Sequence, residues 1–265
     1  MSQHFTPKTN YELIEGDCLK LLPAMPECSV DVVWTDPPYF LSNGGSTCKS
    51  GKRAKVNKGQ WDESKGLQQD HEFHTAWLSG CRRVLKPHGT IWVTATHHTL
   101  FSIGFAMQEL GFKILNLVTW EKPNPSPNLS CRYFTHSTEQ IIWAAKNEKS
   151  KHLFNYADMR AENGGKQMKT VWEFRAPSKA EKSHGDHPTQ KPLALVSRCL
   201  RASSAPGDVV LDPFCGSGTT GVAAVSLGRR FIGIERDSAY RQLSHERVKA
   251  AVSHSQRADE VAFGI

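Results

Sequence analysis

The sequence lacks paired cysteines and long apolar runs. Its seven cysteines are odd in number and no two are spaced as CxxC, so neither a disulfide framework nor a zinc site is expected. No run approaches the roughly 18 apolar residues needed to span a bilayer. Residues 1–11 are polar and lack the apolar core of a signal peptide. We therefore expect a reduced, cytoplasmic protein with no membrane segment.

Metal-ligand clusters are also lacking. His97 adjoins His98, and His184 lies near His187, but neither pair has the accompanying ligands that a metal site needs. No metal ion is expected.

Positive charge, in contrast, is in excess. The 265 residues include 33 Lys and Arg against 26 Asp and Glu, which gives a formal net charge of +7. This balance favours a polyanionic partner such as nucleic acid, although it can also serve solubility alone. The length suits one α/β core with a small appendage and is too short for two full-sized domains.

Short apolar runs alternate with helical patterns along the chain. Strands are expected at residues 11–14, 31–34, 90–94, 112–120, 140–145, 209–211 and 230–234. Helical spacing of apolar residues covers 71–85 and 99–110, the latter closed by Gly111. This alternation predicts an α/β fold with a doubly wound, mainly parallel, Rossmann-like sheet.

Two segments interrupt the alternation. Residues 41–60 contain no acidic residue and five basic ones, which are Lys49, Lys52, Arg53, Lys55 and Lys58. We interpret this segment as a mobile basic loop that contacts DNA phosphates, with solvated charge as the alternative. Residues 147–186 are polar, rich in Lys and weakly periodic, which predicts an appendage at the edge of the sheet.

A glycine-rich turn follows the strand at 209–211. In the run from Asp212 to Gly221, Gly216, Gly218 and Gly221 satisfy GxGxxG. Such a turn brings backbone amides close to a nucleotide-like cofactor, and Glu235, at the end of the next strand, is placed to bind ribose hydroxyls. Taken alone, the motif fits NAD as well.

The position of this turn predicts a circular permutation. Too few residues follow Gly221 to complete the sheet, so its remaining strands must come from upstream. The strand at 11–14 then becomes the third, ending at Asp17, and the strand at 31–34 becomes the fourth, ending at Asp36. Both carboxylates would face the ligand crevice at the carboxyl ends of the strands. For Asp17 the alternative is a helix N-cap.

Asp36-Pro37-Pro38-Tyr39 directly follows the fourth strand. An exocyclic amine of a base is a poor nucleophile because its lone pair is delocalised into the ring. The Asp36 carboxylate and the Pro37 carbonyl can each accept one amine hydrogen and so direct the lone pair outward. Tyr39 can stack on a base that has left the duplex. The alternative, two prolines that merely end a strand, does not explain the glycine turn in the same chain.

These motifs resemble the β-class amino-methyltransferases of DNA, in which DPPY precedes an FxGxG cofactor turn, here Phe214 to Gly218. The resemblance covers nearly the whole chain and implies S-adenosylmethionine as the cofactor. It includes His187-Pro-Thr-Gln-Lys-Pro192, and it implies that Thr189 and Lys191 contact the methionine end of the cofactor. The cofactor set is then Asp17, Asp36, Thr189, Lys191, Asp212, Phe214, Gly216, Ser217, Gly218 and Glu235.

The match is most similar to the DpnA type, which belongs to the DpnII restriction system. This resemblance rests on residues 39–45, 128–139 and 187–192. It implies adenine N6 methylation at GATC, with single-stranded DNA as a further substrate. Besides DNA, the expected partners are a second copy of the chain, in a homodimer, and a cognate restriction endonuclease that acts on the same site. Residues 1–146 would form the catalytic part, 147–186 a target-recognition segment and 187–265 the cofactor-binding part of the same domain.

Several alternatives stay open at this point. Cytosine N4 presents the same chemical problem as adenine N6, although Asp at the head of the tetrapeptide favours adenine. An NAD-binding oxidoreductase or a noncatalytic DNA-binding module is the alternative of another class. Arg132 and Tyr133 follow a proline-rich turn and suit phosphate, guanine or base-stacking contacts, unless they pack against the sheet edge.

Overall fold

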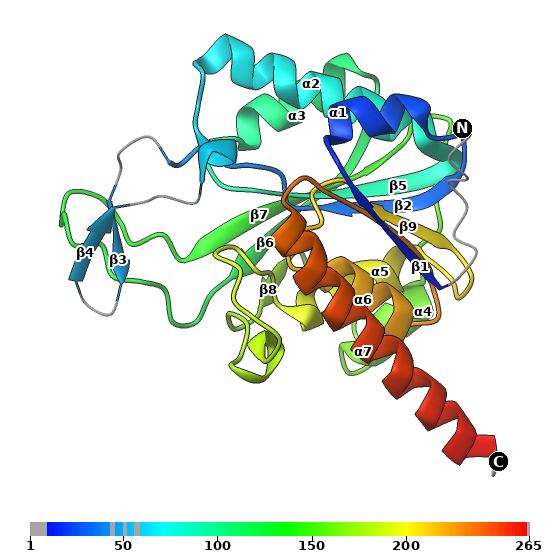
Figure 1. Cartoon of the computed structure of the whole chain (residues 1–265). Helices are drawn as coiled ribbons and strands as arrows, with labels where there is room; N and C mark the ends of the chain where they lie inside the picture. Colours follow the sequence, from blue (N-terminus) through cyan, green and yellow to red (C-terminus); the bar gives the residue numbers. More distant parts are fainter. Residues whose placement is uncertain (1–9, 43–45, 50–51, 56–58, 264–265) are drawn as a thin grey trace.

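The computed structural model describes residues 10–42, 46–49, 52–55 and 59–263. Within this part of the chain, eight strands form one sheet that lies between two layers of helices (Figure 1). In spatial order the strands are β1 (Tyr11–Glu15), β10 (Arg230–Glu235), β9 (Val209–Asp212), β2 (Val30–Thr35), β5 (Leu85–Ala95), β7 (Thr138–Ala145), β6 (Lys113–Glu121) and β8 (Val171–Glu173). All seven predicted strands are present, and the predicted doubly wound α/β fold is confirmed.

The sheet has the predicted permuted strand order. β1, β10, β9, β2 and β5 are parallel, whereas β7 runs antiparallel to both of its neighbours. β9, from late in the sequence, pairs with the early strand β2 through Val210 and Val32. The carboxyl ends of the parallel strands therefore meet at one edge, as a ligand crevice of this fold class requires.

Helices cover both faces of the sheet. On one face lie α1 (Cys18–Leu21), α2 (Leu67–Val84) and α3 (Leu100–Glu109), and on the other α4 (Tyr156–Glu162), α5 (Leu193–Ser203), α6 (Thr219–Ser226) and α7 (Ser238–Phe263). Short 3₁₀ turns occur at η1 (Leu22–Ala24), η2 (Gln60–Asp62) and η3 (Ala180–Lys182). None of the helices in the described ranges is both long and apolar enough to cross a membrane.

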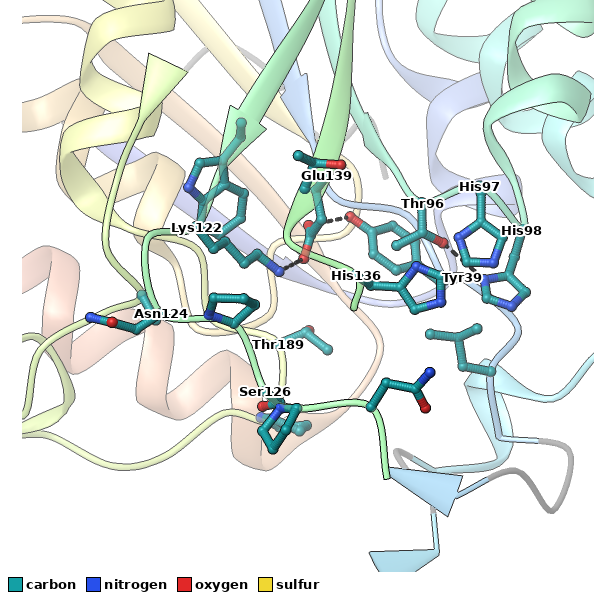
Figure 2. A pocket seen from close by; sticks show the side chains of 18 of the residues that line it. Tyr39, Thr96, His97, His98, Lys122, Asn124, Ser126, His136, Glu139 and Thr189 are labelled. Carbon is teal, nitrogen blue, oxygen red and sulfur yellow. Dashed lines mark hydrogen bonds and ion pairs between the residues drawn. The ribbon is translucent and has the colours of Figure 1, made fainter. Parts of the chain in front are cut away.

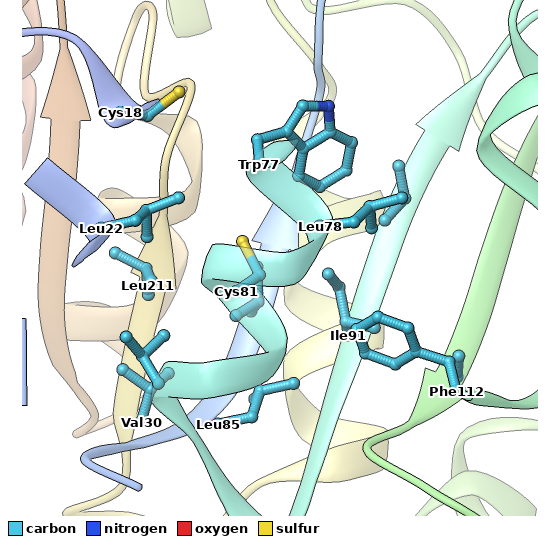
Figure 3. Close-up of a cluster of buried hydrophobic side chains, with 14 of the residues drawn as sticks. Cys18, Leu22, Val30, Trp77, Leu78, Cys81, Leu85, Ile91, Phe112 and Leu211 are labelled. Atoms are coloured by element: carbon cyan, nitrogen blue, oxygen red, sulfur yellow. The ribbon is translucent and has the colours of Figure 1, made fainter. Parts of the chain in front are cut away.

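The periodicity of α2 explains its place in the core. Trp77, Leu78, Cys81 and Val84 follow one another at spacings of one, three and three residues, which places them on one helix face. All four are fully buried. Figure 3 shows this face packed on the sheet beside Ile91 of β5. Burial of one such side chain contributes about 1.5–3 kcal/mol, so the α2 face fixes the sheet that presents the site.

The basic segment 41–60 differs from the expected loop. β3 (Ser46–Lys49) and β4 (Lys52–Lys55) form an antiparallel hairpin that projects from the body of the protein (Figure 1). Alternating polar and small residues had given no clear strand signal there. Lys58 lies outside the described residues.

Residues 147–186 are attached to the sheet edge. β8 pairs in parallel with β6, and Trp172 of β8 and Met159 of α4 are buried in the core cluster on the α5 face. The segment is therefore anchored at both α4 and β8, and the turns between them lie at the surface.

Candidate active site

The glycine-rich turn connects β9 to α6. Gly216 and Gly218 have φ values of +52° and +75°, a left-handed region that favours glycine. A Cβ atom on Gly218 would lie 2.2 Å from the Ser244 hydroxyl oxygen of α7. The GxGxxG motif predicts that the absence of a side chain at Gly218 allows a ligand to approach closely. In the structure, its absence instead allows α7 to pack closely against the turn.

Asp212, at the end of β9, is buried behind this turn. Its carboxylate accepts hydrogen bonds from the Thr35 hydroxyl (3.1 Å), the Thr220 hydroxyl (2.6 Å) and the Phe214 amide (3.0 Å). Burial raises the pKa of Asp212 to about 7, against the opposing effect of these donors. Asp212 thus fixes the turn and also lines the adjacent cavity.

Two acids lie at the ends of the neighbouring strands. The Glu235 carboxylate accepts from the Gly216 amide (2.7 Å) and the Asp237 amide (2.8 Å). Asp17 accepts from the Leu19 amide (2.9 Å) and caps α1, so the N-cap alternative is observed. Both acids also line the cavity, and the cap does not exclude a ligand contact by Asp17.

A cavity of about 560 Å³ lies at the carboxyl ends of β1, β10, β9 and β2. Of the predicted cofactor residues, it is lined by Asp17, Asp36, Thr189, Lys191, Asp212, Phe214, Gly216, Ser217 and Glu235, and not by Gly218. Its volume suits a ligand of nucleoside size. Phe214 offers an apolar surface for a base, and the Glu235 carboxylate is an acceptor that suits ribose hydroxyls. The residues present therefore fit S-adenosylmethionine.

Asp36 lies just beyond β2, at the wall of this cavity. Its Oδ1 accepts from the Tyr39 hydroxyl (2.7 Å) and from the Thr94 hydroxyl, and its Oδ2 accepts from Lys191 Nζ (2.6 Å). The tetrapeptide is held from its other side, because Asp62 Oδ1 accepts from the Tyr39 amide (3.0 Å). Asp36 therefore has a fixed orientation.

A second cavity, of about 900 Å³, adjoins the first. Figure 2 shows Tyr39, Thr96, Lys122 and Glu139 on its wall, and Thr189 and Lys191 line both cavities. Tyr39 is buried, with 5% of its surface exposed. Its hydroxyl donates to Asp36, and the residue lines the second cavity. The two cavities meet at the DPPY tetrapeptide.

The β6–β7 loop forms the rim of the second cavity. Arg132 and Tyr133 line this cavity and are exposed, Tyr133 by 60%. The alternative that they pack against the sheet edge is therefore wrong. A hydrogen bond from Asn128 Nδ2 to the Tyr133 carbonyl (2.5 Å) orders the loop, and both side chains are exposed at the rim.

Sequence reasoning assigned no role to Thr94, Lys122 or Glu139. All three come from strands or strand ends on the same edge of the sheet as Asp36. One signal for Glu139 exists in the sequence, because a carboxylate at the start of an otherwise apolar strand is costly to bury without a partner. A threonine in a strand, such as Thr94, and a lysine after a strand, such as Lys122, are common, so neither gives a signal in the sequence. Their proximity to Asp36 and Glu139 becomes evident only in the fold.

Fold and site together define the class. The protein has a permuted Rossmann-like sheet, a cofactor-sized cavity and a second cavity, and the two cavities meet at the DPPY tetrapeptide. This combination defines an S-adenosylmethionine-dependent methyltransferase that acts on an amine. The model of the N6/N4 methyltransferase family, described as DNA methylase, matches residues 30–246. The chain belongs to this DNA methylase family, and the predicted class, enzyme activity and cofactor are confirmed.

Individual relatives agree with the family. The Type II methyltransferase M2.DpnII of Streptococcus pneumoniae is 48% identical over 94% of both chains. M2.MboI of Moraxella bovis is also 48% identical, over 90% of this chain and 87% of its own. The resemblance to DpnII-type enzymes is therefore confirmed.

Solved structures share the fold. The M1.HpyAVI–SAM complex has a TM-score of 0.68 and 27% identity, covering 90% of this chain and 98% of its own. PvuII DNA methyltransferase, described as cytosine-N4-specific, has a TM-score of 0.72 and 19% identity, covering 94% and 92%. At that identity, the PvuII likeness shows the fold alone.

Proposed function

We propose that the chain methylates the N6 amine of adenine within GATC in DNA, as the modification enzyme of a bacterial restriction system. The observation that carries this proposal is the placement of the DPPY tetrapeptide, because Asp36 and Pro38 line the first cavity and Tyr39 lines the second. The similarity to M2.DpnII and M2.MboI supports adenine and the DpnII-type target.

The hydrogen bonds around Asp36 suit one target amine. A carboxylate oxygen can accept two hydrogen bonds. Among the contacts of the described residues, Oδ1 accepts two and Oδ2 accepts one. One lone pair of Oδ2 is therefore left for an amine hydrogen, and the Pro37 carbonyl would accept the other.

These two acceptors direct the nitrogen lone pair toward the first cavity. When bound there, S-adenosylmethionine supplies an electrophilic methyl group on a sulfonium sulfur. Thr189 and Lys191 line the boundary and would hold its methionine end, while Glu235 would hold the ribose. The target base would enter the second cavity by leaving the duplex, against the Tyr39 ring.

DNA would approach from the rim of the second cavity. Arg132 and Tyr133 would contact phosphate or base, and the basic side chains of segment 41–60 would contact phosphates. We assign target recognition to residues 147–186 together with this rim. A homodimer, a partner endonuclease of the same specificity and a cytoplasmic location complete the proposal.

Methylome sequencing tests the proposal. The chain and its Asp36→Ala variant would be expressed in a bacterial host that lacks its own GATC methylation, and genomic DNA would be read for modified bases. We expect N6-methyladenine at GATC with the native chain and none with the variant. N4-methylcytosine would overturn the adenine assignment, and N6-methyladenine in another context would overturn GATC. In vitro turnover on duplex and single-stranded oligonucleotides then decides strand preference.

A further inference from the structure

Four charged side chains of alternating sign connect the two cavities. Lys191 Nζ lies 2.6 Å from Asp36 Oδ2 and 3.6 Å from Glu139 Oε2, and Lys122 Nζ lies 2.5 Å from Glu139 Oε1. The chain of contacts is therefore Asp36, Lys191, Glu139, Lys122. Figure 2 shows its outer end, where Lys122 meets Glu139 at the wall of the second cavity.

This network is largely withdrawn from solvent. The Lys191 side chain is 6% exposed, those of Asp36 and Glu139 are each 13% exposed, and that of Lys122 is 28% exposed. Removing charges from water is costly, and apolar residues of similar volume often give equal or greater stability than a buried ion pair. Stability therefore does not explain why three further charged side chains form a network with Asp36.

Glu139 is the branching point of the network. It lies within reach of Lys122, Lys191 and the Tyr39 hydroxyl, the last at 3.2 Å. The single Tyr39 proton has two carboxylates within reach, and the shorter contact, 2.7 Å, is to Asp36. Glu139 thus contacts two of the three groups that donate to Asp36.

Charge balance maintains these contacts. Burial alone would raise the pKa of Glu139, but Lys191 and Lys122 outweigh burial and lower it to about 2. Burial alone would lower the pKa of Lys191, but Asp36 and Glu139 outweigh it and raise that pKa. Glu139 therefore stays anionic and helps Lys191 to stay cationic.

We propose that Glu139 and Lys122 are positioning residues for methyl transfer, whose ion pair keeps Lys191 and Tyr39 on Asp36 so that one carboxylate lone pair faces the target amine. The inference rests on the proposed function, because it concerns how Asp36 meets that amine. It predicts that loss of either residue lowers turnover, and that only loss of the Glu139 anion makes turnover sensitive to alkaline pH.

Other titratable groups near Lys191 do not obscure a test by pH. Burial lowers the pKa of His187 to about 4, and burial with Asp36 and Glu139 raises the pKa of Tyr39 well above its usual value. Neither group titrates between about pH 5 and pH 10. Asp212, in the same cavity, has a pKa raised by burial to about 7 and is ionised above about pH 8. A loss of turnover between pH 8 and pH 10 therefore reports Lys191 among these groups.

The test compares Glu139→Gln with Lys122→Met. Both variants would be assayed for single-turnover methyl transfer from pH 6 to pH 10, at saturating S-adenosylmethionine and DNA. The pKa of Lys191 is raised above its usual value near 10.5, so the native chain should show no alkaline loss of turnover up to pH 10. Glu139→Gln removes an anion from beside Lys191, so an alkaline loss should appear below pH 10, with turnover about tenfold lower at neutral pH. Lys122→Met removes a cation from the same network, so it should show no alkaline loss in this range.

A matched control comes from the Lys86–Asp31 ion pair at the amino end of β2, whose charged atoms are 2.8 Å apart and whose side chains are 41% and 20% exposed. Asp31→Asn and Lys86→Met make the same kinds of change at the opposite end of β2 from Asp36 and should match the native profile. Cofactor affinity and thermal unfolding would be measured for every variant.

The outcomes separate three explanations. An alkaline loss below pH 10 in Glu139→Gln alone, with retained cofactor affinity, supports the positioning role. An alkaline loss in both variants, or unchanged turnover in Glu139→Gln, overturns it. If Glu139→Gln does not fold, an alkaline loss below pH 10 in Lys122→Met overturns it. Absence of adenine methylation by the native chain would instead overturn the proposed function, which this comparison assumes.

Discussion

At the scale of single residues, Asp36 carries the chemistry. Its two oxygens accept from Tyr39, Thr94 and Lys191, so its orientation is set before substrate arrives. Preorganised acceptors of this kind need no reorganisation during the reaction. The cofactor cavity, in contrast, is lined by many residues besides Asp36.

Asp36→Ala should therefore lose methyl transfer and keep cofactor binding. Removal of a group that acts chiefly in the transition state costs several kcal/mol, which corresponds to at least about a hundredfold in turnover. Single-turnover kinetics and calorimetry with S-adenosylmethionine measure the two effects separately. Glu27→Ala, at an exposed position before β2, is the control. Near-native turnover of Asp36→Ala would remove it from the mechanism.

Gly218→Ala should destabilise the fold itself. A Cβ atom there meets the Ser244 hydroxyl at 2.2 Å, and φ is +75°. Strain and overpacking together should cost about 2–4 kcal/mol of unfolding free energy. Gly207→Ala is the matched control, because its φ is +87° with nothing within 4 Å of the added Cβ, so it reports the backbone strain alone. Equal urea midpoints for the two variants would show that α7 yields to the extra atom.

At the scale of elements, the β3–β4 hairpin is the basic projection beside the site. Replacing Lys52, Arg53 and Lys55 by alanine should weaken binding to all DNA sequences by a similar factor. If these side chains meet phosphates, the slope of log affinity against log salt should become shallower by up to about 0.9 per lost contact. Fluorescence anisotropy over a salt series measures this slope. A variant that methylates a different sequence would show instead that the hairpin reads bases.

Element positions could be predicted from the sequence where periodicity is strong. The apolar runs at 31–34 and 230–234 lie within β2 and β10, and the helical pattern at 71–85 matches α2 to within a turn. The sequences of β3 and β4, STCK and KRAK, lack the alternation of apolar and polar residues that predicts a strand, so the hairpin could not be predicted. The Lys191–Asp36 ion pair joins residues far apart in sequence, and only the permuted sheet brings them together.

At the scale of the whole molecule, buried histidines make stability depend on pH. Burial lowers the pKa of His74 and of His187 to about 4 each. A group whose pKa is lower in the folded state contributes stability above its unfolded value, near 6.5, and loses it as pH falls toward 4. Each histidine should therefore cost about 3 kcal/mol of unfolding free energy over this range.

His74→Gln tests this dependence away from the site. Urea unfolding of the native chain and the variant between pH 4.5 and pH 8 should show a shallower acid loss in the variant, by up to about one proton. Asp212 acts with the opposite sign, because burial raises its pKa to about 7, so its contribution falls as pH rises from about 4 to 7. Identical slopes for the native chain and His74→Gln would show that His74 does not titrate in this range.

The permuted strand order also has a consequence during synthesis on the ribosome. β1 and β2 emerge early, yet β10 and β9, which lie between them in the sheet, are translated last. Until then, β1 and one side of β2 expose unpaired backbone groups, which are prone to pair with other chains. We therefore expect the nascent chain to be prone to aggregation until β9 and β10 have been translated. Only these two strands complete both the sheet and the cofactor cavity, which Asp212 and Glu235 line.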